Sequence, residues 1–330
     1  MTARAASRRL RTLIDRFGRV RVLVAGDLIA DEFIYGRLDR VSREAPVLIL
    51  RYDSTEVLPG GAGNAAANAA ALGARVDVVG VVGRDEAGDR LRDALPARGT
   101  YGIVRARDFV TPVKTRILAG GVHSAKQQVV RIDRAGSRIA PAVARRVETA
   151  LARSLRLADV VILSDYGAGL VTPARWRRVL AAAGRRPPLV FVDSRYDLTE
   201  FDGITACTPN EPEVEALLGI RIGDDRAALE AAGAELLRRL RCRAVLVTRG
   251  SRGMALFEPD RPPLHIPIVG SDEVADVTGA GDTVIATFAL AVGAGASFAD
   301  AARLANHAAG LVVMKRGTAT VSGAELSESV

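Results

Sequence analysis

The sequence predicts an α/β protein whose doubly wound, mainly parallel β-sheet carries helices on both faces and a small β-lid. Apolar, β-branched runs alternate with alanine-rich stretches of helical length along the 330 residues, as in repeated βαβ units. Two segments without a helical period, at about 33–58 and 109–133, interrupt this alternation. Glycine-rich turns near both ends of the chain indicate a ligand site.

The parallel sheet and its covering helices follow from the order of these runs. Each apolar run has the length of a buried strand, and the stretches between them have the length of crossover helices. The predicted strands cover residues 20–25, 76–82, 160–163, 189–192 and 244–248. The predicted helices cover residues 62–72, 86–95, 142–156, 173–183, 225–240 and 281–291. The spacing i, i+3, i+4, i+7 predicts a further N-terminal helix that buries Leu10, Leu13, Ile14 and Phe17.

The two interrupting segments are predicted to form the lid. Apolar and polar residues alternate in them, as in Val47 and Ile49 and again in Val129, Arg131 and Asp133, which indicates antiparallel strands. No proline- or serine-rich linker separates these segments from the rest. We therefore expect a single domain over residues 1–330 with the lid built into it.

Composition excludes several classes of protein. A hydrophobic content of 48% with 25% charged residues is typical of a globular chain. The longest nearly uncharged stretch, 284–296, is shorter than the roughly 20 apolar residues of a bilayer span, so we expect no membrane insertion. The arginine-rich N-terminus lacks the apolar region of a signal peptide. Cys207 and Cys242 form no CxxC or Cys/His grouping, which predicts reduced thiols and a cytoplasmic location.

The positive charge is spread along the chain. The net charge is +8, and all 46 basic residues except Lys114, Lys126 and Lys315 are arginines. Because no dense basic block occurs, we interpret most of them as solvated helix faces and expect no nucleic acid partner. Anionic small-molecule substrates remain compatible with this charge.

The most specific chemical signal is the sequence DVTGAGDT at 276–283, followed by an apolar helical run. A Gly-x-Gly turn that opens a helix directs backbone N–H groups and the positive end of the helix dipole at one point, which suits a phosphoryl group in transfer. Asp282 stands beside this turn. Since a carboxylate repels phosphate, its expected task is to take a proton from an attacking hydroxyl. The alternative is a glycine-rich turn with Asp282 as a helix cap.

A second glycine-rich turn, PGGAGN at 59–64, opens the first alanine-rich helix. Gly60 and Gly61 permit close approach of the backbone to a ligand, and Asn64 offers a donor and an acceptor to a polyol. Asp27 follows the first strand, at the edge where open α/β sheets bind ligands, and is a candidate to hold two sugar hydroxyls. The alternative is a turn followed by a small-residue helix.

These two motifs, in this order and with a lid between them, resemble the PfkB/ribokinase family of carbohydrate kinases over residues 20–321. The resemblance implies a ribokinase-like fold with ATP and Mg²⁺ as cofactors. It implies that Asp282 is the catalytic base and that Gly279, Ala280 and Gly281 form the anion hole. It also implies sugar contacts from Asp27, Gly60, Gly61 and Asn64. Because exposed lid strands pair subunits in relatives, a homodimer through the lid is expected.

The resemblance extends to the nucleotide side. The sequence TPNEPE at 208–213 is similar to the family's Asn-x-x-Glu element, in which Asn210 and Glu213 would organise Mg²⁺ through water. A helix N-cap at Asn210 is the alternative. The expected nucleotide-binding residues are Asn210, Thr248, Gly250, Gly253, Thr278, Gly279, Gly281 and Asn306. Residues 315–320 are similar to a loop that binds a monovalent cation such as K⁺ in relatives.

Several stretches are similar to one subgroup, the D-glycero-β-D-manno-heptose 7-phosphate kinases. They are VAGD at 24–27 leading to Asp31, YG at 35–36, SREAPV at 42–47, KQQVVRID at 126–133, LSDYG at 163–167 and GTATV at 317–321. The subgroup resemblance implies ATP-dependent phosphorylation of the anomeric C1 hydroxyl to give the 1,7-bisphosphate. The chain ends soon after these motifs, so we expect a separate nucleotidyltransferase to act on the product.

A substrate that already carries a phosphate needs cations, and arginine presents a planar fork that suits phosphate oxygens. The candidate substrate-binding residues of the lid are Arg43, Lys114, Arg116, Lys126, Gln128 and Arg131. We expect only one or two of the cations to touch phosphate. The chain departs from the subgroup on the substrate side: Arg43 stands where Pro is usual, Ala168 where Lys is usual, and Ser194 with Arg195 replaces a Pro-Lys pair.

Other functions remain open at this stage. A PfkB kinase for another sugar, sugar phosphate or nucleoside would use the same phosphoryl-transfer residues. A catalytically silent sugar- or nucleotide-binding regulator is disfavoured by Asp282 and the intact glycine turn beside it. A dinucleotide-dependent dehydrogenase is disfavoured because no G-x-G-x-x-G sequence follows the first strand.

Overall fold

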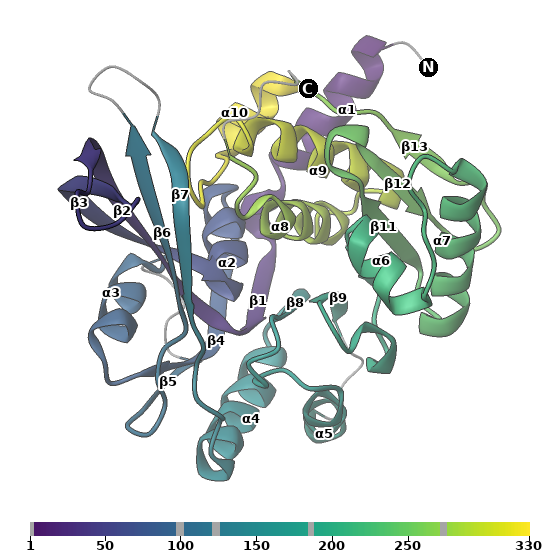
Figure 1. Cartoon of the computed structure of the whole chain (residues 1–330). Coiled ribbons are helices and arrows are strands. Elements are labelled where there is room, and N and C mark those ends of the chain that lie inside the picture. The colour runs from purple at the N-terminus through teal and green to yellow at the C-terminus, as the bar shows by residue number, and fades with distance from the viewer. Residues whose placement is uncertain (1–2, 97–101, 121–125, 184–187, 271–275) are drawn as a thin grey trace.

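A main β-sheet with helices on both faces and a separate four-stranded lid make up the molecule (Figure 1). The computed structural model describes residues 3–96, 102–120, 126–183, 188–270 and 276–330. The layered arrangement of a large, mostly parallel sheet confirms the predicted α/β class. Within the described ranges, no helix has both the length and the hydrophobicity that a bilayer crossing requires.

The main sheet has the strand order β13-β12-β11-β10-β9-β8-β1-β4-β5. Its strands are β1 (Arg21–Gly26), β4 (Arg75–Gly83), β5 (Gly102–Ala106), β8 (Val160–Asp165), β9 (Leu189–Ser194), β10 (Ala206–Cys207), β11 (Ala244–Thr248), β12 (Met254–Phe257) and β13 (Leu264–Ile266). All neighbours from β11 to β5 pair in parallel, whereas β12 and β13 extend the sheet in antiparallel fashion. The winding direction reverses between β1 and β8, so the carboxyl ends of these two strands mark the edge where such sheets bind ligands.

Two hydrophobic cores lie on the two faces of this sheet, because successive strand residues point to opposite sides: Val24 belongs to one core and Leu23 to the other. The first core is covered by α1 (Ala3–Ile14), α2 (Ala62–Ala71), α3 (Glu86–Ala94), α8 (Ala280–Gly293), α9 (Phe298–Val312) and α10 (Gly323–Ser329). The second is covered by α4 (Pro141–Leu155), α5 (Pro173–Ala183), α6 (Glu211–Leu218) and α7 (Arg226–Leu240). Short 3₁₀ turns cover Phe17–Arg19, Leu198–Glu200 and Gly250–Arg252.

The N-terminal helix buries the predicted apolar residues, but it ends at Ile14, and Phe17 stands in the 3₁₀ turn that follows. Leu10, Leu13, Ile14 and Phe17 are all buried in the first core. The helix has no acidic residue in its first turn and is strongly amphipathic, so burial of this stripe holds it in place. On the opposite core, the thiols of Cys207 and Cys242 are free and buried.

The lid consists of β2 (Leu28–Val41), β3 (Leu48–Gly61), β6 (Val113–Gly120) and β7 (Gln127–Arg134), in the order β3-β2-β6-β7. The β2–β3 and β6–β7 pairs are antiparallel, as predicted, but β2 and β6 pair in parallel, so the expectation of a purely antiparallel lid is wrong. The two hairpins come from separate parts of the chain, and their first strands, β2 and β6, run in the same direction. Residues 121–125 of the predicted lid lie outside the described residues.

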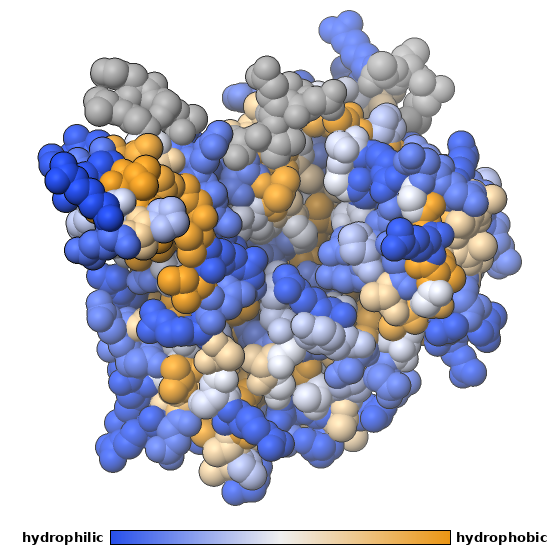
Figure 2. Space-filling view, in the orientation of Figure 1, coloured by the Kyte–Doolittle hydropathy of each residue, from blue (hydrophilic) through white to orange (hydrophobic). Residues whose placement is uncertain are grey.

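The two faces of the lid differ in character. Strand register places Asp31 opposite Lys114 and Lys114 opposite Asp133, and the next residues on the same face are Phe33 and Arg116. This polar face is turned toward the main sheet, as the contact of Lys114 with Tyr166 shows. The exposed apolar residues of the lid are Leu38, Val41, Val47, Leu48, Tyr52, Val129, Val130 and Ile132. Figure 2 shows apolar side chains gathered over the lid strands.

Candidate active site

The first turn of α8 has the shape that the DVTGAGDT motif predicts. Gly279 is the N-cap, with φ of +77°, and a Cβ at this position would lie 2.3 Å from Nδ2 of Asn64, so only glycine fits. Asp276 fixes the preceding turn, because its carboxylate accepts hydrogen bonds from the backbone N–H groups of Thr278 (2.9 Å) and Gly317 (3.0 Å). A Cβ at Gly281 would meet no atom within 4 Å, so the helix opens onto free space here.

Asp282 is buried in the first turn of α8, two residues after Ala280. Its Oδ2 accepts a hydrogen bond from Nδ2 of Asn64 and its Oδ1 accepts one from the Tyr166 hydroxyl, each at 2.9 Å. Burial raises the pKa of Asp282 to about 6, and the two hydrogen bonds limit this rise. Asp282 is therefore ionised at neutral pH yet more basic than an exposed aspartate. The alternative in which Asp282 caps the helix is wrong, since the cap is Gly279.

A buried amide network joins α2 to α8. Asn64 donates both to Asp282 and to the carbonyl oxygen of Gly279 (3.2 Å). Asn68 donates to Oδ1 of Asn64 (3.0 Å) and accepts from the hydroxyl of Thr283 (3.1 Å). Asn64 is therefore held at both ends of its amide. Asn68 was not predicted as a site residue, although its spacing of four from Asn64 on a helix places it on the same face.

The turn before α2 brings the lid against the main sheet. A Cβ at Gly60 would lie 2.3 Å from Oδ2 of Asp31, and Gly61 has φ of +58° with its Cβ position only 2.6 Å from the carbonyl oxygen of Asp27. Both glycines are thus required by close approach. The approach at Gly60 is to a carboxylate of β2, Asp31, which the sequence analysis did not single out as a site residue.

Asp27 holds the loop that follows β8. Its Oδ2 accepts backbone hydrogen bonds from Tyr166 and Ala168, both at 2.9 Å, and its Oδ1 accepts one from Leu170 at 3.3 Å. Burial is the main reason that the pKa of Asp27 rises to about 6, and the amide hydrogen bonds counter it. The structure therefore places the predicted sugar contact among backbone donors of the 165–170 segment.

Tyr166 lies between two cations. The Lys114 ammonium, from the lid, is 5.0 Å from the centre of its ring, and the guanidinium of Arg195, from the end of β9, is 4.6 Å from it. Burial, followed by the nearby Asp282 charge, raises the pKa of Tyr166 well above its usual value, so the hydroxyl stays protonated and donates. Asp193, at the end of β9, has a pKa raised chiefly by burial and then by Glu213 and Asp282. Tyr166, Arg195 and Asp193 were not predicted as site residues, although Tyr166 and Arg195 stand in the stretches compared with the subgroup.

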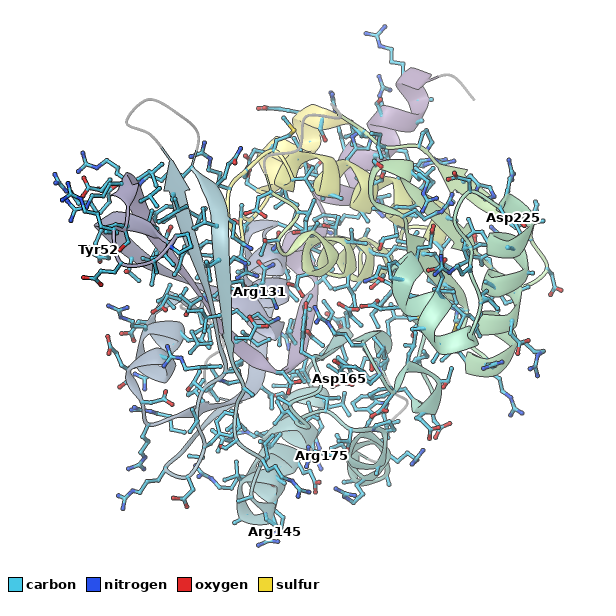
Figure 3. The ribbon with its side chains drawn as sticks, in the orientation of Figure 1. Tyr52, Arg131, Arg145, Asp165, Arg175 and Asp225 are labelled. Atoms are coloured by element: carbon cyan, nitrogen blue, oxygen red, sulfur yellow. The ribbon has the colours of Figure 1, made fainter. Side chains whose placement is uncertain are left out.

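The lid brings three of its predicted cations to this place. Arg116 is buried and pairs with Asp31 at 2.6 Å, and Arg131 donates two hydrogen bonds to Asp133, at 2.7 and 2.6 Å. Lys114 makes no ion pair among the described residues, and burial lowers its pKa. Of these three cations, Lys114 is therefore the one whose charge is left for a ligand. Figure 3 labels Arg131, on the lid strand next to that of Lys114, and Asp165, the residue before Tyr166.

The other predicted lid residues lie elsewhere. Arg43 is exposed in the turn between β2 and β3, at the far end of the hairpin from Asp31. Lys126 pairs with Asp53 at 2.7 Å and lies 5.4 Å from the ring centre of Tyr35. Gln128 is exposed on β7. The structure does not bring these three side chains to Asp282.

A pocket of about 200 Å³ lies on the other side of the α8 turn. Five predicted nucleotide-binding residues line it: Thr248, Gly250, Gly253, Gly281 and Asn306. Its remaining walls are mainly apolar and were not predicted; they include Met254, Ile268, Val269, Val277, Val284, Ala309 and Val313. An apolar pocket that reaches a helix N-terminus suits a purine base with its phosphates at the N–H groups. Asn306 fixes the wall by donating to the carbonyl oxygen of Pro267 at 2.7 Å.

Asn210 and Glu213 form a capping box at the start of α6. Oδ1 of Asn210 accepts from the Glu213 N–H, and Oε2 of Glu213 accepts from the Asn210 N–H, both at 2.9 Å. The cap alternative is thus present, and it leaves Oε1 of Glu213 without a hydrogen bond from the described residues. A free carboxylate oxygen fits Mg²⁺ that keeps most of its waters. In the part of the chain that the structure describes, no group of three or more Asp, Glu, His or Cys forms a metal cluster.

The segment expected to bind a monovalent cation lies beside the α8 turn. The Lys315 ammonium donates to the carbonyl oxygen of Thr320 (2.7 Å) and to Glu325 (2.6 Å). Thr318 is buried, and its hydroxyl has no hydrogen-bond partner among the described residues. The segment is therefore packed against the site residues and carries a positive charge of its own.

Comparison with known proteins places this site in a family. The description "pfkB family carbohydrate kinase" matches residues 23–324. The chain is 43% identical over 307 residues to the bifunctional protein HldE of Caulobacter vibrioides, and 42% identical over 323 residues to that of Geobacter sulfurreducens, covering 93% and 97% of this chain. It spans 62% and 64% of the length of these two relatives.

Two solved structures with a similar fold are kinases. Arabidopsis thaliana ribokinase complexed with ribose and ATP has a TM-score of 0.72 at 23% identity, covering 94% of this chain and 98% of that chain. Phosphofructokinase-2 from Escherichia coli with fructose-6-phosphate has a TM-score of 0.75 at 18% identity, covering 94% and 97%. These similarities confirm the predicted ribokinase-like fold. The match over residues 23–324, together with the identities above, shows that the chain belongs to the pfkB family of carbohydrate kinases.

Proposed function

We propose that this chain transfers the γ-phosphoryl group of ATP to the anomeric C1 hydroxyl of D-glycero-β-D-manno-heptose 7-phosphate and so forms the 1,7-bisphosphate. The observation that carries the proposal is Asp282, a buried carboxylate in the first turn of α8, between the glycine turn and a lid cation, Lys114. Family membership supports the kinase activity. The heptose stretches of the sequence and the identity to HldE support the substrate.

In this mechanism Asp282 takes the proton of the C1 hydroxyl as its oxygen attacks the γ-phosphorus in line. The new O–P bond forms while the bond between the γ-phosphorus and the bridging oxygen of ADP breaks, and ADP leaves with that electron pair. The N–H groups of Gly279 and Gly281 in the α8 turn would stabilise negative charge on the transferred group. The N–H of Ala280, which the prediction included, donates instead to the carbonyl oxygen of Val277 at 3.3 Å. Asn64 donates to one oxygen of Asp282 and so limits rotation of the carboxylate that takes the proton.

Divalent and monovalent cations belong to the proposal. Mg²⁺, when bound, neutralises the charge of the ATP phosphates. Glu213 and Asn210 would hold it through water, with the free Oε1 of Glu213 as the acceptor for a metal-bound water. The 315–320 segment would bind a monovalent cation such as K⁺. Activity measured against MgCl₂ and KCl concentration tests both requirements.

The substrate phosphate is assigned to the inner face of the lid. Lys114 is half-buried without a carboxylate partner among the described residues, and the Coulombic influence of Arg195, Arg131 and Arg116 on its pKa places these cations near it. A dianion bound there would gain from Lys114 and Arg195, neither of which makes an ion pair among the described residues, whereas Arg116 and Arg131 are already paired with Asp31 and Asp133. Asp31 would accept hydrogen bonds from the sugar, since Gly60 leaves its carboxylate room against the turn before α2.

The apolar outer face of the lid is proposed as a homodimer interface. Val130 and Ile132 are 48% and 51% exposed on an edge strand, and Leu38 and Tyr52 add apolar surface on the neighbouring hairpin. Exposed apolar edge strands tend to pair with another chain. A second copy would cover this patch.

The substrate assignment is tested by ADP release with Mg²⁺ and ATP against heptose 7-phosphate, fructose 6-phosphate, fructose 1-phosphate, ribose and adenosine. We expect a kcat/KM for heptose 7-phosphate at least tenfold above that of any other member. Preference for another sugar would leave the proposed mechanism in place and overturn the proposed substrate. This outcome is worth testing because Ala168 and Arg195 depart from the residues usual in the heptose 7-phosphate kinases. No sugar-dependent ADP release would favour a binding protein without catalysis.

A further inference from the structure

Tyr166 contacts the proposed base but has no part in the mechanism above. Its hydroxyl donates to Oδ1 of Asp282 at 2.9 Å, while Asn64 donates to Oδ2 at the same distance. A carboxylate has about four lone-pair positions, so both bonds leave room for a substrate hydroxyl. The geometry points to Tyr166 as a positioning residue that holds Asp282 in its attacking orientation, an inference that rests on the proposed kinase function.

The backbone of Tyr166 is fixed by two acidic side chains. Its N–H, with that of Ala168, donates to Asp27 at 2.9 Å. The next N–H, that of Gly167, donates to Asp165 at 3.0 Å, and the Ser194 hydroxyl donates to the other oxygen of Asp165 at 2.8 Å. The side chains that make these hydrogen bonds, those of Asp27, Asp165 and Ser194, are buried at the strand ends. Tyr166 therefore stands on a rigid support, which a positioning residue requires.

The ring of Tyr166 is fixed as well. Lys114 approaches it from the lid at 5.0 Å and Arg195 from β9 at 4.6 Å. These cations belong to the group assigned above to the substrate phosphate. Tyr166 thus connects the proposed site of the substrate phosphate to the proposed base, through its ring at one end and its hydroxyl at the other. Lys114, at the ring, belongs to the lid, and Asp282, at the hydroxyl, belongs to α8.

Loss of the hydroxyl has two chemical consequences. With Asn64 alone, the Asp282 carboxylate is held at one oxygen and turns more freely about its Cβ–Cγ bond, so fewer encounters lead to in-line attack. The carboxylate also loses a donor that stabilises its ionised form, so its pKa rises. The other charged groups that face Asp282 are Asp31 on β2, Lys114 on β6 and Asp193 on β9, with Arg195 behind Tyr166, and a Tyr166→Phe change leaves all four in place.

The test is Tyr166→Phe, which keeps the ring and its cation contacts. Kinetics are measured from pH 5 to 9 with the sugar phosphate that the unaltered enzyme prefers. We expect the acid limb of kcat/KM to move up by about one pH unit. At pH 8.5, where Asp282 is ionised in both the unaltered enzyme and the variant, we expect kcat of the variant to be about 10- to 100-fold lower. The KM for the sugar phosphate should change less than about threefold, because no proposed substrate contact is removed.

Two controls separate this role from general damage to the fold. Tyr196→Phe removes a hydroxyl from a neighbouring tyrosine that is 68% exposed, and it should leave the pH profile unchanged. In an Asp282→Asn background, adding Tyr166→Phe should cause no further loss of kcat, since the residue acts through the carboxylate. An additional loss there would overturn the inference. A ¹³C NMR titration of the Asp282 carboxyl, assigned by its absence in Asp282→Asn, reports the pKa change without turnover.

The outcomes for the inference and for the proposed function differ. Suppose that the unaltered chain is active and that Tyr166→Phe has the same acid limb of kcat/KM and the same pKa of Asp282. This result would overturn the positioning role and leave the kinase function intact. Absence of sugar-dependent ADP release from the unaltered chain would overturn the kinase function, and the positioning role with it. A raised acid limb with a lowered kcat and a nearly constant KM would support both.

Discussion

Asp282 owes its chemistry to its surroundings. An exposed aspartate is a weak base, but burial raises the pKa of Asp282 to about 6, and Asn64 fixes one of its oxygens. The glycine at position 279 is part of the same arrangement, because any side chain there would collide with the Asn64 amide. The proposed base, the amide that binds it and the proposed anion hole are therefore specified together by two short motifs on α2 and α8.

Removal of the Asp282 charge tests its role as base. Asp282→Asn retains the size and a hydrogen-bond acceptor but cannot take the proton. We expect kcat to fall by about 10²- to 10⁴-fold with little change in KM for ATP or sugar. Coupled ADP release in the unaltered and altered enzymes measures this. Near-normal turnover of the variant would contradict the assignment.

The pH dependence follows from the same pKa. Because the folded-state value of Asp282 is about 6, the ionised, active fraction is nearly complete above pH 7 and falls about tenfold per pH unit well below pH 6. We therefore expect kcat/KM to have an acid limb near pH 6, two units above the value for an exposed aspartate. An acid limb near pH 4 would show that the ionisation of another group controls the rate.

The buried Arg116–Asp31 ion pair can be compared with the exposed Arg131–Asp133 ion pair of the same lid. Both side chains of the first pair are buried, so Arg116→Met leaves the Asp31 carboxylate without its partner and should lower the free energy of unfolding by about 3 kcal/mol. Arg131→Met breaks the exposed pair with Asp133 and should cost less than about 1 kcal/mol. Urea denaturation at pH 7.5 measures both. Equal losses would contradict the distinction by burial.

The site residues that sequence reasoning found and those that it missed differ in one physical respect. Asp282, Gly279 and Asn64 stand in contiguous motifs whose local geometry is encoded by glycines. Tyr166 and Arg195 reach the site only because β8 and β9 are neighbours in the sheet. Asp27 was found, but its three hydrogen-bond donors belong to a loop far along the chain. Tertiary pairing of this kind leaves no periodic signal in one sequence.

At the scale of elements, α6 combines a structural and a proposed catalytic role at its first residues. Its capping box satisfies two backbone N–H groups, and the same glutamate keeps a free oxygen for a metal-bound water. A helix N-terminus at this edge of the sheet also directs positive partial charge toward the nucleotide site. The two roles can be separated by substitution.

Asn210 gives that separation. Asn210→Ala should lower the free energy of unfolding by about 1 kcal/mol, because the cap is lost. Asn210→Ser keeps a capping hydroxyl and should restore most of that stability. If Asn210 also organises Mg²⁺, both variants should raise the KM for Mg-ATP by a similar factor. An unchanged KM in both would limit Asn210 to its structural role.

The secondary structure was predictable for most of the long, regular elements, although the 15-residue helix α9 was not among the predicted ranges. The five predicted strands and six predicted helices correspond to β1, β4, β8, β9 and β11 and to α2, α3, α4, α5, α7 and α8. The strands that were missed are short or lie at the sheet edge, as with β10 and β13. The parallel pairing of β2 with β6 was missed because residue alternation reveals that a strand exists but not which strand it joins.

At the scale of the whole molecule, the lid divides its surfaces between two tasks. Its inner face carries the charges that surround the proposed substrate, and its outer face carries exposed apolar residues. Alternation along each strand makes this division possible, since neighbouring residues point to opposite sides. If the outer face pairs two copies, each subunit holds the lid of the other in position.

The dimer is tested by charge on the apolar face. Ile132→Asp should convert the protein to a monomer, because two buried carboxylates would face one another across the interface. Leu157→Asp places the same charge on a residue that is 58% exposed after α4 and should leave the mass unchanged. Light scattering after size-exclusion chromatography measures the mass. A monomeric unaltered protein would contradict the proposed interface.

The lid is joined to the main sheet without any spacer. β1 ends at Gly26 and β2 begins at Leu28, while β3 ends at Gly61 and α2 begins at Ala62. The Ala62 N–H donates to the carbonyl oxygen of Asp27, which ties these two junctions together at 3.1 Å. A rotation of the lid therefore pulls on the first turn of α2, where Asn64 holds Asp282. Under the proposed function, closure of the lid on a substrate and alignment of Asp282 would be one motion, so a substrate too small to move the lid would also leave the proposed base poorly aligned.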